Sequence, residues 1–411
     1  MRKIYLDNSA TTPLDRKVIS AMKKYWRKSF GNPSSIHKMG VEAKNVLEKA
    51  RKVIADFLNA HDREIIFTSG GTEANNLAIF GIRGLLSRTS HRLHADSFNV
   101  DQTKNSFVKM HFITTEIEHS SILECFKKLE KDGHEISYLK VDQFGLVNPK
   151  DLREMIKLET VLISIGYANS EIGTVEPLRE IIKEIRHKKK EFSREKNGLP
   201  YFHSDASQAG LYLNMNVEDL GVDLMTLDAQ KMYGPKGVGA LFVRDGIKIE
   251  PIIFGGGQEM GMRSGTENIP LVVGFAKAIE IAKEKKEKES NRLLKLRDGF
   301  FDGIKKTTPS AFINGHLEAR LPNNINISIP GQDGEMLVFR LDEKGIVCSS
   351  ASACSSGSGE SYVVRKISEK MNLSKEEIDS RAKSTLRFST GKDTRKRYLK
   401  YLLKCLKDLI K

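Results

Sequence analysis

Short apolar runs and longer amphipathic runs alternate along most of this sequence. Between positions 43 and 58 apolar residues recur on one stripe at helical spacing, which predicts a strongly periodic helix. Strand-type apolar runs occupy positions 64–68, 108–114 and 161–167, and each is followed by a polar turn and another helical pattern. This alternation is typical of an α/β fold in which helices cover both faces of a largely parallel sheet.

The C-terminal third has a different pattern. A long charged helix is predicted over residues 270–296, and it leads into a segment with shorter strands. The strands predicted there cover residues 324–329, 345–348 and 386–389. We therefore expect a large domain over residues 15–286 and a smaller α+β domain built from residues 1–14 and 287–411. Residues 87–109 are polar and lack periodicity, which indicates an insertion at the surface.

Composition places broad limits on the class of protein. The chain has 411 residues, 39% of them hydrophobic and 29% charged, which is ordinary for a globular protein of two or three domains. No apolar run approaches the roughly 20 residues of a membrane span. The N-terminus enters a strand pattern without the apolar region of a signal peptide. A cytoplasmic protein without a membrane partner is therefore expected.

Cysteine spacing and charge exclude some kinds of site. The four cysteines are too few and too scattered for a disulfide framework, and they lack the CxxC spacing of many metal sites, so we expect no metal. The net charge of +14 comes from lysine-rich runs that stand beside glutamates in helical patterns. Such runs are typical of solvated helix faces. This charge pattern does not require a nucleic-acid partner, although it does not exclude a modest affinity for RNA.

Two charged residues near the middle of the chain follow strand-type runs. Asp205 follows the run 199–203, and Lys231 follows the run 222–227. Ligands of open α/β sheets bind at the carboxyl ends of strands, so both side chains are expected to face one crevice. A lysine amine can form a Schiff base with the aldehyde of pyridoxal phosphate, and a carboxylate can keep its ring nitrogen protonated. The pair therefore favours a site for this cofactor. The alternative is that both are solvated surface side chains without a binding role.

Other polar residues stand at the same end of the predicted sheet. At Gly71 and Thr72 a strand, a glycine turn and a helix N-terminus follow one another, which makes a cradle of backbone N–H groups for an anion. His119 and Asn169 each follow a further strand. A random scatter would not favour one end of the sheet. Their coincidence therefore favours a binding site over any single-residue explanation.

Two residues of the C-terminal part carry reactive or binding groups. Cys354 stands at the centre of a serine- and glycine-rich loop, residues 349–359, where a thiol is reachable. The other cysteines stand among apolar or helical neighbours and are interpreted as packing residues. Arg387 lies in a predicted strand, and its guanidinium can bind a substrate carboxylate through two hydrogen bonds. A surface salt bridge is the alternative for Arg387.

Ten short motifs follow one another along the chain. They are YLDNSATTP (5–13), FGNPSS (30–35), FTSGGTEAN (67–75), EH (118–119), NSEIG (169–173), DASQ (205–208), KMYGPKG (231–237), GGGQE (255–259), MRSGT (262–266) and SAC (352–354). Together they resemble the NifS/IscS-type cysteine desulfurases of the class V aminotransferase family, over nearly the whole chain. The resemblance implies a fold-type I pyridoxal phosphate-dependent transferase, with a mostly parallel seven-stranded sheet in the large domain and the catalytic cysteine loop in the small one.

The resemblance implies roles for the residues around the cofactor ring. Lys231 would hold the cofactor, Asp205 would pair with its ring nitrogen, and His119 would stack on the ring and assist proton transfer. Gln208 and Asn169 resemble the groups near the ring oxygen, and Asn169 also stands on the substrate side.

The same resemblance implies which residues bind the cofactor phosphate, the substrate and its sulfur. Gly71 and Thr72 resemble phosphate ligands, and Thr266 resembles the residue that reaches the phosphate of the neighbouring subunit in a homodimer. Arg387 would anchor the carboxylate of L-cysteine, and Cys354 would accept its sulfur as a persulfide while alanine is released. A sulfur-acceptor protein, either an iron–sulfur scaffold or a tRNA thiolase, would then take the sulfur.

The sequence departs from the family pattern just before Lys231. The family usually has Ser-x-His-Lys there, with Ser and His donating to the cofactor phosphate, and this chain has Asp228 and Gln230 at those positions. Gln230 can still donate, whereas an ionised Asp228 would repel a phosphate. Either Asp228 turns away, or cofactor binding is weakened, or the local arrangement differs. An active cysteine desulfurase is the first interpretation; a selenocysteine lyase or other class V enzyme, or a catalytically weak sulfur-relay partner, are the alternatives.

Overall fold

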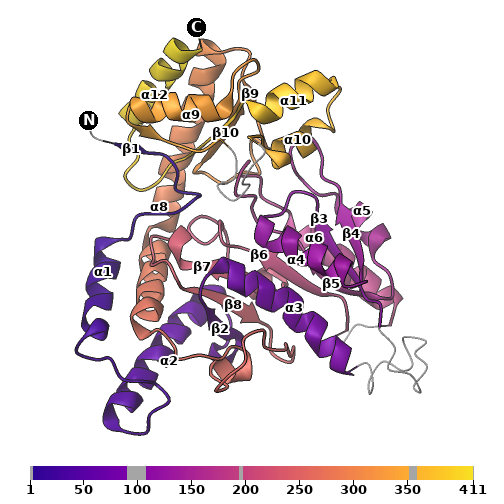
Figure 1. The fold of residues 1–411 in the computed structure, drawn as a ribbon, viewed down its shortest axis with the longest axis vertical. Coiled ribbons are helices and arrows are strands. Elements are labelled where there is room, and N and C mark those ends of the chain that lie inside the picture. The colour runs from indigo at the N-terminus through magenta and orange to yellow at the C-terminus, as the bar shows by residue number, and fades with distance from the viewer. Residues whose placement is uncertain (1–2, 90–107, 194–197, 351–358, 411) are drawn as a thin grey trace.

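A central sheet organises the larger part of the molecule, and the computed structural model describes residues 3–89, 108–193, 198–350 and 359–410 of the chain. The strands of this sheet are β2 (Ile65–Thr68), β3 (His111–Thr115), β4 (Glu135–Leu139), β5 (Thr160–Ser164), β6 (Tyr201–Asp205), β7 (Leu224–Asp228) and β8 (Gly239–Val243). Their order is β2-β8-β7-β6-β5-β3-β4, and β8 points in the opposite direction to the other six strands (Figure 1). The expected mostly parallel seven-stranded sheet is confirmed.

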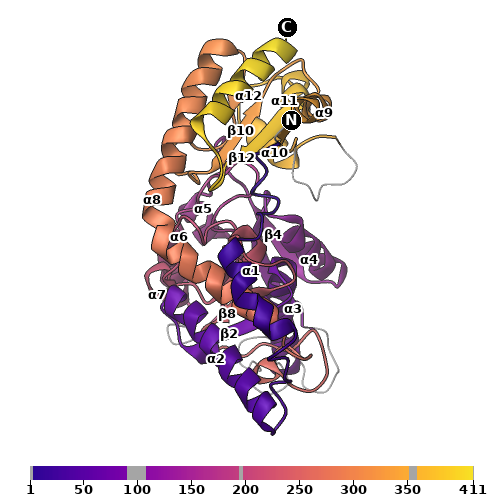
Figure 2. The same ribbon diagram turned by 90° about the vertical axis from the view of Figure 1, so that its left-hand side faces the viewer.

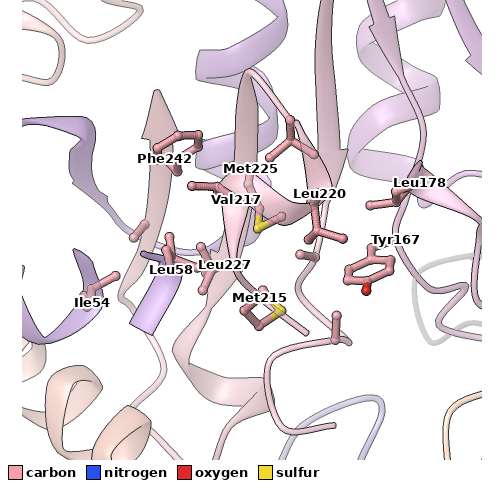
Figure 3. Close-up of a cluster of buried hydrophobic side chains, with 14 of the residues drawn as sticks. Ile54, Leu58, Tyr167, Leu178, Met215, Val217, Leu220, Met225, Leu227 and Phe242 are labelled. Atoms are coloured by element: carbon pink, nitrogen blue, oxygen red, sulfur yellow. The ribbon is translucent and has the colours of Figure 1, made fainter. Parts of the chain in front are cut away.

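Helices cover both faces of this sheet, because its strands are apolar on both sides. On one face pack α2 (Lys38–Leu58), α5 (Pro149–Met155), α6 (Leu178–Glu191), α7 (Val217–Leu220) and the first half of α8 (Ile269–Thr307). Figure 3 shows part of this core, with Leu58 of α2, Leu227 of β7 and Phe242 of β8 in one cluster. On the other face pack α3 (Gly71–Thr89) and α4 (Ser120–Lys131).

A smaller body lies at the far end of α8, as Figure 2 shows. Its strands are β1 (Ile4–Tyr5), β9 (Phe312–Ile313), β10 (Asn324–Ser328), β11 (Ile346–Val347) and β12 (Thr385–Ser389), and its helices are α9 (Gly334–Glu343), α10 (Tyr362–Ser368), α11 (Lys375–Lys383) and α12 (Lys396–Leu409). Phe300 of α8, Phe388 of β12 and Leu402 of α12 belong to its core. One continuous helix thus contributes to the cores of both bodies, and the division at residue 286 stays a prediction.

Some element boundaries differ from those expected. The helix predicted from residue 270 continues past residue 296 to Thr307, because Phe300, Phe301 and Ile304 bury their side chains in the smaller body. The N-terminal helix is α1 (Arg16–Met22), followed by a 3₁₀ turn over Lys23–Trp26. Helix α3 extends to Thr89, into the insertion expected from residue 87, and positions 90–107 lie outside the described residues. No helix within the described ranges has the length and apolar character needed to cross a membrane.

Candidate active site

A cavity of about 330 Å³ lies where the carboxyl ends of the central strands meet, and β12 of the smaller body contributes to its wall. Small-molecule sites commonly have volumes of roughly 300–1,000 Å³. The residues of its wall that the sequence analysis singled out are Gly71, Thr72, His119, Asn169, Asp205, Gln208, Asp228, Gln230, Lys231 and Arg387. The expectation that these side chains gather in one crevice agrees with the structure, and their roles stay predictions.

The direction of the strands explains this gathering. Strands β3, β5, β6 and β7 are parallel neighbours, so their carboxyl ends reach the same edge of the sheet. Asp205 is the last residue of β6, and Asp228 is the last residue of β7. Both β2 and β7 run antiparallel to β8, so β2 points the same way and brings Gly71 to that edge.

Asp205 and Lys231 are held in place by groups from distant parts of the chain. Asp205 Oδ2 accepts a hydrogen bond of 2.8 Å from Asn75 Nδ2, and its Oδ1 accepts one of 2.9 Å from the backbone of Ser207. Lys231 Nζ donates to the carbonyl oxygens of Ser9 (2.7 Å) and Ala10 (2.6 Å). The N-terminal segment therefore positions the Lys231 amine at the cavity. The sequence around Lys231 does not predict this contact.

His119 caps the N-terminus of α4 and points its ring at the cavity. Its Nδ1 accepts from the backbone N–H of Ser121 (3.2 Å) and lies 2.9 Å from the hydroxyl oxygen of the same residue. Since Nδ1 is an acceptor, the ring hydrogen of the neutral imidazole is on Nε2. Burial lowers the pKa of His119, which favours this neutral form.

A chain of hydrogen bonds joins His119 to Asp205. Asn75 Nδ2 donates to Asp205 and also to the hydroxyl of Ser121 (2.9 Å), which faces His119 Nδ1. The amide, the hydroxyl and the imidazole thereby have fixed orientations. Sequence reasoning missed Asn75 and Ser121, because neither follows a strand directly, and only the packing of α3 beside α4 brings them together.

Arg387 is buried rather than part of a surface salt bridge, so that alternative was wrong. Its Nη2 donates to Asp7 Oδ1 (3.0 Å) and to Ser349 Oγ (3.3 Å), while its Nη1 donates to the carbonyl oxygen of Ser170 (3.2 Å). Its buried Nε has no hydrogen-bond partner among the described residues. A guanidinium in this setting can receive a substrate carboxylate in addition to Asp7.

Asn169 and Gln208 shape the wall of the cavity through their own hydrogen bonds. Asn169 Oδ1 accepts from the backbones of Glu171 (2.9 Å) and Ile172 (3.0 Å), and its Nδ2 donates to the carbonyl oxygen of Ile117 (3.0 Å). Gln208 Nε2 donates to the carbonyl oxygen of Ser9 (3.0 Å). Both side chains are thus oriented before any ligand binds.

An anion cradle occupies the end of the cavity at the N-terminus of α3. A Cβ atom on Gly71, the first residue of α3, would stand 2.9 Å from Ser207 Oγ, so any larger residue there would require the Ser207 side chain to move. The Asp228 carboxylate accepts hydrogen bonds from the backbone of Gln230 and from Gln230 Nε2, and it lies against Gly71 at the start of α3. Asp228 therefore faces the cradle and does not turn away from it.

Two predicted residues are not part of this cavity. Thr266 is exposed and lies outside its wall. Cys354 lies outside the described residues. Described residues on either side of it contact the site: Ser349 Oγ accepts from Arg387, and the Tyr362 hydroxyl of α10 (Tyr362–Ser368) donates to the carbonyl oxygen of Glu118.

Comparison with known proteins agrees with this geometry. The sequence matches the family Aminotransferase class-V over residues 4–96 and 98–400. It is 44% identical over 410 residues to a protein named cysteine desulfurase IscS of Dictyoglomus turgidum, covering 100% of this chain and 95% of that protein. Solved structures are similar over most of both chains: a "NifS-like protein" has a TM-score of 0.84 at 33% identity (99% of each chain), and "SspA in complex with cysteine" has 0.75 at 32% identity (94% and 98%). The chain therefore belongs to the class V aminotransferase family, among its cysteine desulfurases of the NifS/IscS type.

Proposed function

We propose that this protein is a pyridoxal phosphate-dependent cysteine desulfurase, which converts L-cysteine to L-alanine and keeps the sulfur as a persulfide on Cys354. The observation that carries the proposal is the convergence of the Lys231 amine, the Asp205 carboxylate, the His119 ring and the Arg387 guanidinium on one cavity. A related solved protein is described in complex with cysteine, which supports the same substrate here.

The residues of the cavity fit this cofactor. Lys231 would hold its aldehyde carbon, Asp205 its ring nitrogen, and the glycine cradle at the start of α3 its phosphate. Thr72 and Gln230 stand beside that cradle and can donate hydrogen bonds. When bound, the cofactor supplies an electron sink for the negative charge that develops at the substrate α-carbon.

The remaining chemistry belongs to the side chains. Arg387 binds the carboxylate of L-cysteine and orients the substrate, while Lys231 Nζ takes the proton from its α-carbon. His119 is neutral with a hydrogen on Nε2, so it can donate a proton at the substrate and recover one later. The Cys354 thiolate attacks the substrate sulfur; an S–S bond forms and the substrate C–S bond breaks, with its electron pair going to the β-carbon. The β-carbon then takes a proton and the α-carbon regains the one that Lys231 removed, which gives alanine.

Partners follow from the same proposal. Thr266 is exposed, as a residue that reaches the phosphate of a second subunit has to be, so we include a homodimer in the proposal. The persulfide sulfur would pass to an acceptor protein for iron–sulfur cluster assembly or tRNA thiolation. The cytoplasm stays the predicted compartment.

An absorption spectrum of the purified protein, recorded before and after addition of L-cysteine, tests the proposal together with alanine and sulfide assays. We expect the visible band of the lysine-bound cofactor, its change with L-cysteine, and release of alanine with reducible sulfur. Lys231→Ala is expected to lose the band, and Cys354→Ser is expected to keep the band but lose desulfuration. A protein that stays colourless with added cofactor would refute the proposal.

A further inference from the structure

Asp228 occupies an unusual position for a carboxylate. It is 6% exposed, at the last position of β7, and caps the short 3₁₀ helix η3 (Ala229–Lys231). Its Oδ1 accepts from the backbone of Gln230 (3.2 Å), and its Oδ2 accepts from Gln230 Nε2 (3.1 Å). The backbone N–H of Gly71 lies near this carboxylate and acts to lower its pKa.

The groups around the Asp228 carboxylate, Gly71 and Gln230, are the same groups that are expected to bind the cofactor phosphate. Gly71 is the first residue of the 19-residue helix α3, whose N-terminal N–H groups carry the positive end of the helix dipole. A Cβ on Gly71 would stand only 3.4 Å from Asp228 Oδ2, so the carboxylate lies against the helix terminus. In the structure the chain's own anion lies beside the N–H groups at the start of α3 and takes both hydrogen bonds of Gln230.

Among the described residues, few positively charged groups lie near Asp228 to compensate the negative charge of a phosphate that binds beside it. Lys231, three residues further along, is the cation whose charge acts on the Asp228 carboxyl, and its amine is held by the carbonyl oxygens of Ser9 and Ala10. His119 faces Asp228 from the start of α4 and is held neutral by burial. From the other packed elements, α3 contributes Gly71, and β8 pairs the uncharged Gly239 with Asp228.

The protonation state of Asp228 therefore decides what the cradle can bind. Burial raises the pKa of the Asp228 carboxyl, while the hydrogen bond from the Gln230 side chain and the charge of Lys231 act in the opposite direction. An ionised carboxylate only accepts hydrogen bonds, so it competes with a phosphate for Gly71 and Gln230 and repels its charge. A protonated carboxyl donates one hydrogen bond and carries no charge.

We propose that Asp228 takes up one proton from solvent when the cofactor phosphate enters the cradle, so that it changes from a competitor for the phosphate into a hydrogen-bond donor to it. This inference rests on the proposed function, because it concerns the same cofactor. Binding coupled to the uptake of a proton becomes weaker as the pH rises. For one proton the dissociation constant increases by about tenfold per pH unit above the pKa of the free carboxyl.

Pyridoxamine 5′-phosphate is the probe that isolates this effect, because it carries the phosphate and lacks the aldehyde that would react with Lys231. Its affinity is measured by titration calorimetry over a range of pH for the wild type and for Asp228→Asn, an uncharged variant of the same shape. Titrations in two buffers of different ionisation enthalpy give the number of protons taken up. Changes that arise from the probe, His119 or Lys231 are common to both proteins and cancel in the comparison.

We expect the wild type to lose about tenfold in affinity per pH unit at alkaline pH relative to Asp228→Asn, and to take up about one more proton on binding. Asp228→Ser serves as the second uncharged variant, so a failure of one variant to fold leaves the comparison intact. Equal pH profiles and equal proton uptake in wild type and variants would overturn this inference while leaving the proposed function standing. Absence of binding by every protein at every pH would overturn the cofactor assignment, and the inference with it.

Discussion

The buried Arg387 and the partly buried Asp7 form an ion pair at the point where a substrate carboxylate is expected. Nη2 of Arg387 lies 3.0 Å from Asp7 Oδ1, and the Arg387 side chain is almost fully buried. Buried pairs lose much of their hydration, so they are kept only where geometry and further hydrogen bonds compensate. Ser349 and Ser170 supply those bonds. The pair holds the guanidinium in one orientation before substrate arrives.

Replacement of Arg387 by lysine tests whether the two guanidinium donors bind the substrate carboxylate. Arg387→Lys keeps the charge opposite Asp7 but loses the planar pair of donors, so one or two charged hydrogen bonds to the substrate carboxylate disappear. Each such bond contributes about 1.5–3 kcal/mol, so the KM for L-cysteine is expected to rise roughly 10- to 150-fold for one lost bond and more for two. Steady-state kinetics measure this, with pyridoxamine 5′-phosphate binding as the control that stays unchanged. An unaltered KM would contradict the assigned role.

Glu118 is a buried carboxyl in the wall of the same cavity, and sequence reasoning noted it only as the neighbour of His119. It accepts from the Thr115 hydroxyl (2.8 Å) and from the backbone of Gly166 (3.0 Å). Burial raises the pKa of Glu118 from 4.5 to about 7, although these hydrogen bonds oppose the shift. The pKa of the buried Glu176 is raised as well, also by burial. The carboxyl of Glu118 thus titrates near neutral pH.

The raised pKa has a direct consequence for stability. The folded chain holds the Glu118 proton at pH values at which the unfolded chain has released it, so its contribution is present in full below about pH 4.5 and is lost as the pH rises toward 7. The loss amounts to about 3 kcal/mol. Glu118→Gln is expected to unfold at higher urea concentration than the wild type at alkaline pH and to match it in acid. An identical dependence on pH in both proteins would argue against a protonated Glu118.

At the scale of elements, one residue at the N-terminus of α4 both caps the helix and presents its ring to the cavity. His119 caps this helix through Nδ1, and the same ring reaches the cavity. The capping bond orients the imidazole, and Ser121 and Asn75 continue the contact to the end of β6 at Asp205. The helix therefore fixes which nitrogen faces the ligand.

Two substitutions separate these tasks. His119→Asn retains a good N-cap, so the free energy of unfolding is expected to change little, whereas His119→Ala is expected to lose about 1 kcal/mol. Both remove the Nε2 hydrogen, and kcat is expected to fall roughly 10²- to 10⁴-fold in each. Urea unfolding and steady-state kinetics measure the two effects. Full activity in His119→Asn would show that the ring has no chemical role.

At the scale of the whole molecule, large apolar side chains are exposed on the larger body. Ile36 is 98% exposed and Phe254 is 75% exposed. Their two segments are neighbours, because Pro33 lines a surface cavity together with Gly256 and Met260. The exposed Thr266 follows in the same loop region. Exposed apolar side chains on neighbouring segments are typical of an interaction surface, and a second copy of the chain is the partner that the proposed homodimer requires.

Phe254→Asp tests whether this surface holds the dimer. A charge in place of a central aromatic residue is expected to weaken association by at least about 30-fold, in line with the 2 kcal/mol or more carried by interface hot spots. Light scattering after size-exclusion chromatography reports the change of mass with concentration. Phe339→Asp is the matched control, because Phe339 is 67% exposed but lies on α9 of the smaller body. Loss of the dimer in the control alone would place the interface elsewhere.

The sequence by itself determined the class of fold, the family and the edge of the sheet where the site lies. The class of fold and the edge follow from local signals, because apolar periodicity sets strands and helices, and parallel strands send the residues after them to one edge. Asp205, Lys231, His119 and Asn169 were found in this way, whereas Arg387 lies within a strand of the smaller body and was singled out for its guanidinium. The family follows from the resemblance of ten ordered motifs.

Only the tertiary structure decided which groups hold those residues. The carbonyl oxygens that bind Lys231 come from more than 200 residues away, and Asp7 meets Arg387 across 380 positions. The Asp228 carboxylate lies in the cradle because β7 ends beside the N-terminus of α3. Contacts of this kind depend on how whole elements pack, and no periodicity within either segment records them.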